Sequence, residues 1–451
     1  MKFHRVSLTA LFLLLLTTEM SLHAAQNVTC TTLPNGLKVI VRESHETNLA
    51  AIEIWVRAGS VHETEANNGI SHLIEHMTFK ATPKHGPGEL DRELEGLGAE
   101  VNGGTSKDWV HFYTTVASES LPKALDLLGD AISNVQFRPE DIDKERMVVM
   151  DEIAREQGDP AKMAFIDFAK TAFPTSPYRL SATGTHDVVA KLTHDDLLAY
   201  RNLYYTPDNI CVVIVGDVST DSATEMVRKA FAGLSGRQAD GMTGGQDDGM
   251  TGRQDDVKNP EATAASLSKR ATFSGSGSQA YVVFGYPAPP VSEFKDACAL
   301  DVILAILGET NRGRLASAFM SSGIPFTKIA TDFMVQRYPS TVSALVAVNP
   351  RDADRAGTIL QAEFHRLAGQ PVTEGELFQA KRLVEGSDLF DQETFSGQAR
   401  TMGLYASIGS YDMALNYSNT VDSLTASDIQ DTARKYFGEN SIETVVAPDS
   451  H

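Results

Sequence analysis

Two histidines four positions apart, with a glutamate between them, are the feature that most constrains this chain. His72, Glu75 and His76 lie in a segment whose apolar residues recur at helical spacing. On a helix, residues three and four positions apart share one face, so both imidazoles and the carboxylate project together. Two imidazoles on adjacent turns supply half of a tetrahedral Zn²⁺ site, and a nearby carboxylate can hold or deprotonate a metal-bound water. The pattern therefore predicts a metal site on a helix.

The same pattern also has a plainer interpretation. The order His-x-x-Glu-His is the inverse of the commoner His-Glu-x-x-His, and it occurs among metalloproteases. A surface helix with two solvated histidines would have the same letters, and three fixed residues in five occur by chance. Asn67 or Asn68 is expected to cap the start of this helix. The motif alone leaves both interpretations open.

Size and charge narrow the class of protein. The chain has 451 residues, which is enough for about two to three domains. Its formal net charge of -20 argues against a protein that binds nucleic acid or anionic membranes. An acidic protein can favour basic substrates, although the net charge does not say which surface carries it.

The start of the chain, at 1–25, has the pattern of a secretory signal peptide. A positively charged start is followed by an apolar core at 8–16, which is too short to span a bilayer, and then by small residues suited to cleavage. The alternative is an apolar first helix of the fold. No later stretch reaches the ~18 uninterrupted apolar residues of a transmembrane helix. We expect an exported protein, periplasmic or secreted, with no membrane span.

The order of apolar patterns predicts an α+β architecture. Alternation at 52–56 indicates a half-buried strand, with Glu53 and Trp55 on the face away from the core. Longer periodic segments indicate helices at 121–134 and 139–156. The segment at 235–268 is rich in glycine and aspartate and poor in apolar residues, which predicts a flexible linker.

The end of the chain repeats the end of its first half. Thr193 and Asp196 recur as Thr425 and Asp428, and an apolar run that follows the first pair also recurs at the same offset. Matches in one register indicate two copies of a domain, at 26–234 and 269–451. After His194 the only histidines are His365 and His451, so the second copy cannot build a site with two imidazoles.

With these features, the chain resembles the pitrilysin family of inverzincin metallopeptidases. The similar branch is the two-domain one that includes the mitochondrial processing peptidase and bacterial zinc protease subunits. The resemblance covers about 28–448 and is most specific at 72–80. The family's third ligand is a glutamate at a fixed distance beyond the second histidine, and that position is Glu152 here. A further family glutamate, two helical turns before the third ligand, is Glu145.

The resemblance implies a zinc-dependent endopeptidase that cuts short or unfolded peptides in a closed chamber. Two similar domains would face each other as a clamshell, and one Zn²⁺ per chain would be held by His72, His76 and Glu152. Glu75 would be the general base. Glu145 would be a second catalytic residue, which orients a histidine or lines the site. The substrate would lie as an extra strand along Asn102, Gly103, Gly104, Thr105 and Ser106.

The chain departs from the family pattern in its second half. The family usually has an Arg and a Tyr there, about two helical turns apart, that grip the substrate across the cleft. The Tyr position falls at Phe326 and the Arg position at Phe319 or Met320, and none of these side chains donates a hydrogen bond. One explanation is a heterodimer, in which a homologous partner supplies the Arg and Tyr; a homodimer or a weak peptidase acting alone is the other. A zinc-binding scaffold without turnover, or a purely structural zinc site, remains an alternative function.

Overall fold

The computed structural model describes residues 28–234, 268–275, 277–308 and 313–448. The predicted signal peptide at 1–25, and all but the last residue of the predicted linker at 235–268, lie outside the described residues. Among the described residues, no helix combines the length and the apolar character needed to cross a bilayer.

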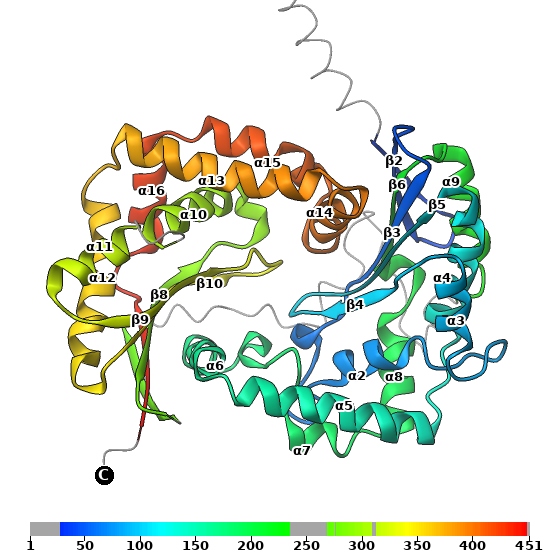
Figure 1. Ribbon diagram of the computed structural model, residues 1–451, viewed down its shortest axis with the longest axis horizontal. Helices are drawn as coiled ribbons and strands as arrows, with labels where there is room; N and C mark the ends of the chain where they lie inside the picture. Colours follow the sequence, from blue (N-terminus) through cyan, green and yellow to red (C-terminus); the bar gives the residue numbers. More distant parts are fainter. Residues whose placement is uncertain (1–27, 235–267, 276, 309–312, 449–451) are drawn as a thin grey trace, which may run out of the picture.

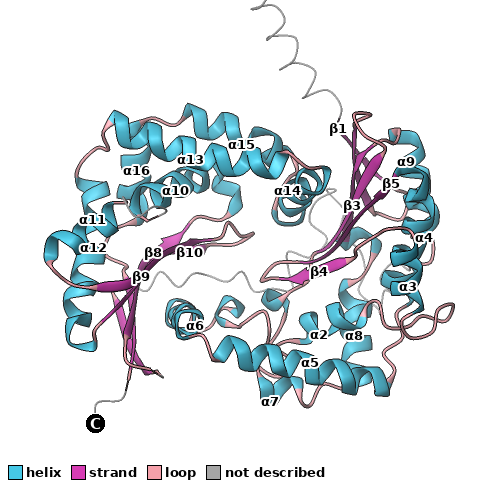
Figure 2. Ribbon diagram, in the orientation of Figure 1, coloured by secondary structure: helices cyan, strands magenta, loops and turns pink. Residues whose placement is uncertain are grey.

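The first half of the chain folds into a mixed six-stranded sheet covered by helices (Figures 1 and 2). Its strand order is β1-β2-β6-β3-β5-β4, in which only β2 and β6 pair in parallel. The strands are β1 (Val28–Thr32), β2 (Lys38–Glu43), β3 (Leu49–Val56), β4 (Asn102–Thr105), β5 (Val110–Ala117) and β6 (Ile210–Gly216). The helices are α2 (Ile70–Met77), α3 (Glu89–Gly96), α4 (Leu121–Asn134), α5 (Pro139–Gln157), α6 (Pro160–Ala172), α7 (His186–Val189), α8 (His194–Tyr204) and α9 (Thr220–Ala230).

The second half repeats this plan with a five-stranded sheet in the order β7-β11-β8-β10-β9. Its strands are β7 (Lys269–Ser274), β8 (Ala280–Ala288), β9 (Phe326–Phe333), β10 (Ser340–Val348) and β11 (Ile442–Ala447). Its helices are α10 (Phe294–Leu307), α11 (Arg314–Ser322), α12 (Ala353–Gly369), α13 (Glu374–Gln392), α14 (Phe395–Ile408), α15 (Asp412–Ser423) and α16 (Ala426–Tyr436). Strands β2, β6, β3, β5 and β4 of the first sheet correspond in order to β7, β11, β8, β10 and β9.

The internal repeat predicted from the sequence is confirmed. Helices α8 and α16 both begin with a capping box, formed by Thr193 with Asp196 and by Thr425 with Asp428. Each helix leads to a strand, β6 or β11, that has a neighbouring strand on both sides in its own sheet. The α+β fold with two homologous halves facing each other is therefore the observed one (Figure 1).

Each half sends one helix to cover the sheet of the other. Helix α14 packs on β3 and β6, where Met402 and Ala406 join Trp55 in one apolar cluster. Helix α6 packs on the second sheet, where Phe168 and Leu345 belong to one apolar cluster. These exchanged contacts bury apolar surface on both sheets, so the two halves form one interlocked body.

The exchange corrects the expectation for the strand at 52–56. Strand β3 was expected to be half-buried, but all of its residues after Leu49 are buried. Glu53 is 0% exposed and Trp55 is 1% exposed. The prediction was wrong because the face that carries both side chains is covered by α14, which belongs to the second half of the chain.

The start of α2 is also formed differently from the prediction. The residue that caps α2 is Gly69, which has a φ of 97° and offers no side chain, so neither Asn67 nor Asn68 is the cap. The buried carboxylate of Glu63 takes over this role, accepting hydrogen bonds from the backbone N–H groups of Gly69 (2.7 Å) and Ser71 (3.0 Å). A carboxylate at this place satisfies free N–H groups and interacts favourably with the helix dipole.

We expect Glu63→Gln to destabilise the fold at the start of α2. The amide removes the charge and one of the acceptors that face three donors, on Asn68, Gly69 and Ser71. The free energy of unfolding should therefore fall by about 1–3 kcal/mol. Urea denaturation followed by circular dichroism measures this change. Glu119→Gln, at an exposed position, is the matched control, and an equal effect of the two substitutions would contradict the role given to Glu63.

Candidate metal centre

Helices α2 and α5 bring three predicted ligands together. His72 and His76 leave one face of α2, and Glu152 reaches them from α5, which packs directly against α2 (Figure 1). The position of α5 is fixed by Val149 and Ile153, which are buried in the core of the first half. Glu152 lies three positions after Val149, at the margin of this buried stripe, and its carboxylate reaches both imidazoles.

The distances among the three groups fit a tetrahedral metal. The two Nε2 atoms lie 3.2 Å apart, and Oε2 of Glu152 lies 3.3 Å from His72 Nε2 and 3.6 Å from His76 Nε2. Zinc bonds of about 2.0–2.2 Å in a tetrahedron place neighbouring ligand atoms about 3.3–3.6 Å apart. The residues present therefore match the ligand type, number and spacing that Zn²⁺ requires, with a fourth position left for water or substrate.

The surroundings of His72 favour a neutral imidazole. His72 is 8% exposed. Burial, reinforced by the neighbouring His76, lowers the pKa of His72 below its ordinary value. A neutral imidazole is the form that binds a metal, so this helix face is prepared to act as a ligand.

Glu75 stands next to these ligand atoms but is held by other contacts. Its Oε2 accepts a hydrogen bond of 2.6 Å from the hydroxyl of Thr105, at the end of β4. Burial raises the pKa of Glu75, while the Thr105 hydrogen bond opposes that shift. A carboxylate with a raised pKa in this place is suited to take up a proton and release it again.

Glu145 lies behind the ligand group and not within it. Its Oε2 is 3.4 Å from Nδ1 of His76, and its Oε1 is 2.9 Å from Nζ of Lys80. A carboxylate on the far ring nitrogen orients the imidazole and leaves Nε2 free for a metal. Glu145 can therefore hold His76, and Lys80 in turn anchors Glu145.

Strand β4 offers an open edge beside this group. It pairs with β5 on one side and has no strand on the other among the described residues. Of the predicted substrate-binding residues, Asn102 to Thr105 form β4 and Ser106 follows it. A Cβ added at Gly103 would lie 3.1 Å from the carboxylate of Glu75, so the glycine lets a backbone come close to that group.

Phe319, Met320 and Phe326 stand where the family pattern has an Arg and a Tyr, and none of them offers a hydrogen-bond donor to the candidate metal centre. Phe319 is fully buried in the core of the second half, with its ring 5.8 Å from that of Phe326. Met320 is 63% exposed. The structure thus gives these three residues packing and surface roles.

Sequence reasoning missed Glu63 and the contact that Thr105 makes with Glu75. Glu63 holds the start of α2, and Thr105 fixes the carboxylate of Glu75. Glu63 lies in a loop, so no helical spacing links it to α2. The contact between Thr105 and Glu75 joins the end of a strand to a helix. No local pattern marks either contact, although Thr105 lies inside the segment expected to bind substrate.

Comparisons with known proteins identify the family of the chain. The segment 38–186 matches the family described as Insulinase (Peptidase family M16), and 191–384 matches the Peptidase M16 inactive domain. The zinc protease PqqE of Helicobacter pylori is 26% identical over 439 residues, covering 96% of each chain. A probable mitochondrial-processing peptidase subunit beta of Arabidopsis thaliana is 25% identical, covering 93% of this chain and 78% of the relative.

A solved structure has the same fold. The crystal structure of a protease from Helicobacter pylori superposes with a TM-score of 0.83 at 24% identity, covering 93% of this chain and 99% of that one. The two family matches confirm the expected pitrilysin-type family, and the likeness to the solved structure shows the same fold. Both halves of the chain, from the helix with the two histidines to the second sheet, belong to peptidase family M16.

Proposed function

We propose that this protein is a zinc-dependent endopeptidase that hydrolyses short or unfolded peptides. The observation that carries the proposal is the convergence of His72, His76 and Glu152 on one point, beside Glu75 and a free strand edge. Relatives named as zinc proteases support the same class of reaction. The proposal includes the exported location expected from the segment 1–25.

The chain's own residues would divide the reaction between them. The edge of β4 binds the peptide backbone as an added strand, which sets the scissile bond beside Glu75. Glu75 accepts a proton from the attacking water and returns it to the leaving amine. A Zn²⁺ ion held by His72, His76 and Glu152 would supply a Lewis acid that polarises the carbonyl and makes water more acidic. Glu145 keeps the ring of His76 in its ligand orientation.

A partner subunit is part of the proposal. Phe319, Met320 and Phe326 cannot donate the hydrogen bonds that the family's Arg and Tyr would give, and several relatives are named as subunits of larger assemblies. We propose that a homologous chain supplies these donors in a heterodimer. Purification from the native host should then yield a second homologous chain. If this chain is recovered alone and has full peptidase activity, the proposal of a partner subunit is contradicted.

A second candidate function also follows from the replacement of the family's Arg and Tyr by side chains that donate no hydrogen bond. Without a donor for the developing oxyanion, the chain could bind peptides and zinc without turning substrate over, since one such donor is worth about 2.7–4 kcal/mol of barrier. Robust cleavage by the purified protein, alone or with its partner, excludes this scaffold function.

Glu75→Gln should abolish most turnover and leave the metal in place. The amide cannot accept the proton, so kcat should fall by about 10²–10⁴-fold, while bound zinc measured by atomic emission stays near one per chain. Glu119→Gln is the control for a surface substitution. Unchanged cleavage by Glu75→Gln would refute the role of this residue as the base.

Glu152→Gln should weaken metal binding without unfolding the chain. Zinc at about 100 times its Kd stabilises a protein by about 2.7 kcal/mol, which a thermal melt detects as a raised Tm. We expect this shift in the parent and its loss in Glu152→Gln. Asp151→Asn, at the exposed neighbouring position, should keep the full shift, and a full shift in Glu152→Gln would remove this glutamate from the ligand set.

A further inference from the structure

The two halves of the chain meet at a junction beside the end of β4. On the first half, the junction is formed by the turn at 106–109, which joins β4 to β5. On the second half, it is formed by the hairpin tip at 334–339, which joins β9 to β10. Ser106 lies against Met334, with its Oγ 3.6 Å from Sδ of the methionine. The end of β4, which the proposed function assigns to the substrate, is therefore in contact with the second half.

Asp108 is the acceptor at the centre of this junction, and it is only 5% exposed. Its Oδ1 accepts a hydrogen bond of 2.7 Å from the hydroxyl of Tyr178, and its Oδ2 accepts one of 3.4 Å from the backbone N–H of Arg337. The hydroxyl oxygen of Tyr178 in turn accepts a hydrogen bond of 3.3 Å from the backbone N–H of Tyr338. One carboxyl of the first half thus holds, directly or through Tyr178, two backbone donors of the hairpin tip.

Lys107 ties the turn to the segment that carries Tyr178. Its Nζ donates hydrogen bonds of 2.7 Å to the carbonyl oxygens of Tyr178 and Leu180. Carboxylates from β9, α5 and the loop before α2 act on its charge, namely Asp332, Glu156 and Glu63. Within the described part of the chain, Asp108 forms no ion pair with Lys107 or Arg337, whose charges act on it from a greater distance. The carboxyl is therefore buried with hydrogen-bond donors but without a cation bonded to it.

Burial dominates the ionisation of Asp108. It raises the pKa of this carboxyl to about 6, although hydrogen bonds from Tyr178 and Arg337, and the charges of Arg337 and Lys107, oppose the shift. A solvated aspartate has a pKa of about 3.9. The other titratable groups that touch this turn change charge at higher pH, because burial lowers the pKa of Lys107 only to about 8 and raises that of Tyr178.

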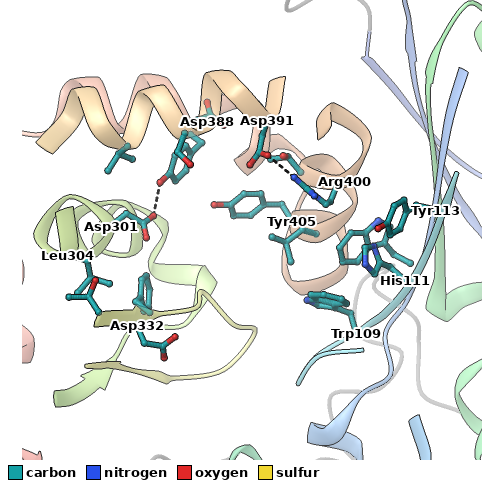
Figure 3. A pocket seen from close by; sticks show the side chains of 18 of the residues that line it. Trp109, His111, Tyr113, Asp301, Leu304, Asp332, Asp388, Asp391, Arg400 and Tyr405 are labelled. Atoms are coloured by element: carbon teal, nitrogen blue, oxygen red, sulfur yellow. Dashed lines mark hydrogen bonds and ion pairs between the residues drawn. The ribbon is translucent and has the colours of Figure 1, made fainter. Parts of the chain in front are cut away.

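The burial of Asp108 makes docking of the hairpin tip depend on pH. The junction borders a cavity of about 590 Å³ between the halves, which Trp109 and Asp332 line from opposite sides (Figure 3). If the tip lifted, water from this cavity would reach Asp108, and its pKa would fall towards that of a solvated aspartate. The docked form binds the proton more tightly, so proton uptake favours docking. This contribution is complete below about pH 4 and is lost as the pH rises through about 6.

We propose that Asp108 is a pH-sensitive clasp, which docks the hairpin tip of the second half beside the end of β4 and holds it more tightly when protonated. The clasp is a property of the fold and does not require that the chain cleaves peptides. Because Ser106 lies two residues before Asp108 and contacts Met334, the docked tip also forms the surroundings of the last predicted substrate-binding residue. Mildly acidic conditions thus favour the form in which both halves border this edge.

Amide hydrogen exchange of the hairpin tip tests the clasp on the full chain. Mass spectrometry of fragments that contain 334–339 gives the protection of their amides relative to the intrinsic exchange rate at each pH, which removes the pH dependence of the exchange chemistry itself. Protection at pH 5 should exceed protection at pH 7.5 by about tenfold, as follows from pKa values of about 6 in the docked form and 3.9 in the undocked form. Asp108→Asn, which has the same shape and no charge, should reduce this ratio to about one.

Three further variants separate the clasp from its surroundings. Asp332→Asn removes a neighbouring carboxyl whose pKa burial also raises, and it should keep most of the ratio. Asp126→Asn, at an exposed position on α4, should keep all of it. Tyr178→Phe removes the donor to Asp108 and the acceptor for Tyr338, so protection of the tip should fall by about two- to tenfold at both pH values.

Two results overturn the clasp. The first is equal protection of the parent at pH 5 and pH 7.5, which needs no variant to fold. The second is a tenfold ratio that persists in folded Asp108→Asn. Neither result bears on peptide cleavage, so failure of the clasp and failure of the proposed peptidase function are distinguished.

Discussion

The contact between Glu152 and two imidazoles is the interaction on which the site depends. Three groups that present lone pairs lie 3.2–3.6 Å from one another. Groups of this kind need a cation or a shared proton between them, since buried acceptors without donors are costly. The packing of α5 against α2 therefore positions the site as well as stabilising the core. A rotation of α5 would move the carboxylate of Glu152 away from the two imidazoles.

The exchange of helices between the halves gives this centre its surroundings. Helix α14 covers the first sheet and α6 covers the second, so each sheet is packed against a helix of the other half. The free edge of β4 runs through the middle of that arrangement (Figure 2). The candidate metal centre lies on the face of β4 that Gly103 shares with Glu75, and His111 lies on the other face, against Gly104.

Much of the fold could be predicted because local sequence patterns determine where its helices and strands begin and end. The helix at 121–134 has the bounds of α4, the capping boxes at Thr193 and Thr425 begin α8 and α16, and the constant offset between the two ends corresponds to a structural repeat. These features depend on spacing within one or two turns, or on self-similarity of the sequence. The family resemblance added Glu152, which its own helix does not distinguish from neighbouring charged residues.

The features that could not be predicted depend on contacts that no regular spacing marks. Glu53 and Trp55 alternate with apolar residues as a solvent-facing pair would, and only α14 makes that face an interior one. The cap of α2 comes from Glu63, which lies in the loop before that helix. The periodicity of apolar residues distinguishes the two faces of a helix or strand. It does not show which other element will pack on each face.

X-ray absorption at the zinc edge of the metal-loaded protein examines the central geometry most directly. The account predicts one zinc per chain, with two imidazole nitrogens and a carboxylate oxygen at about 2.0–2.2 Å. Replacement of Glu152 by glutamine should change the oxygen shell and keep both imidazoles. A spectrum with no imidazole in the first shell, or a parent protein that binds no zinc at all, would contradict the account.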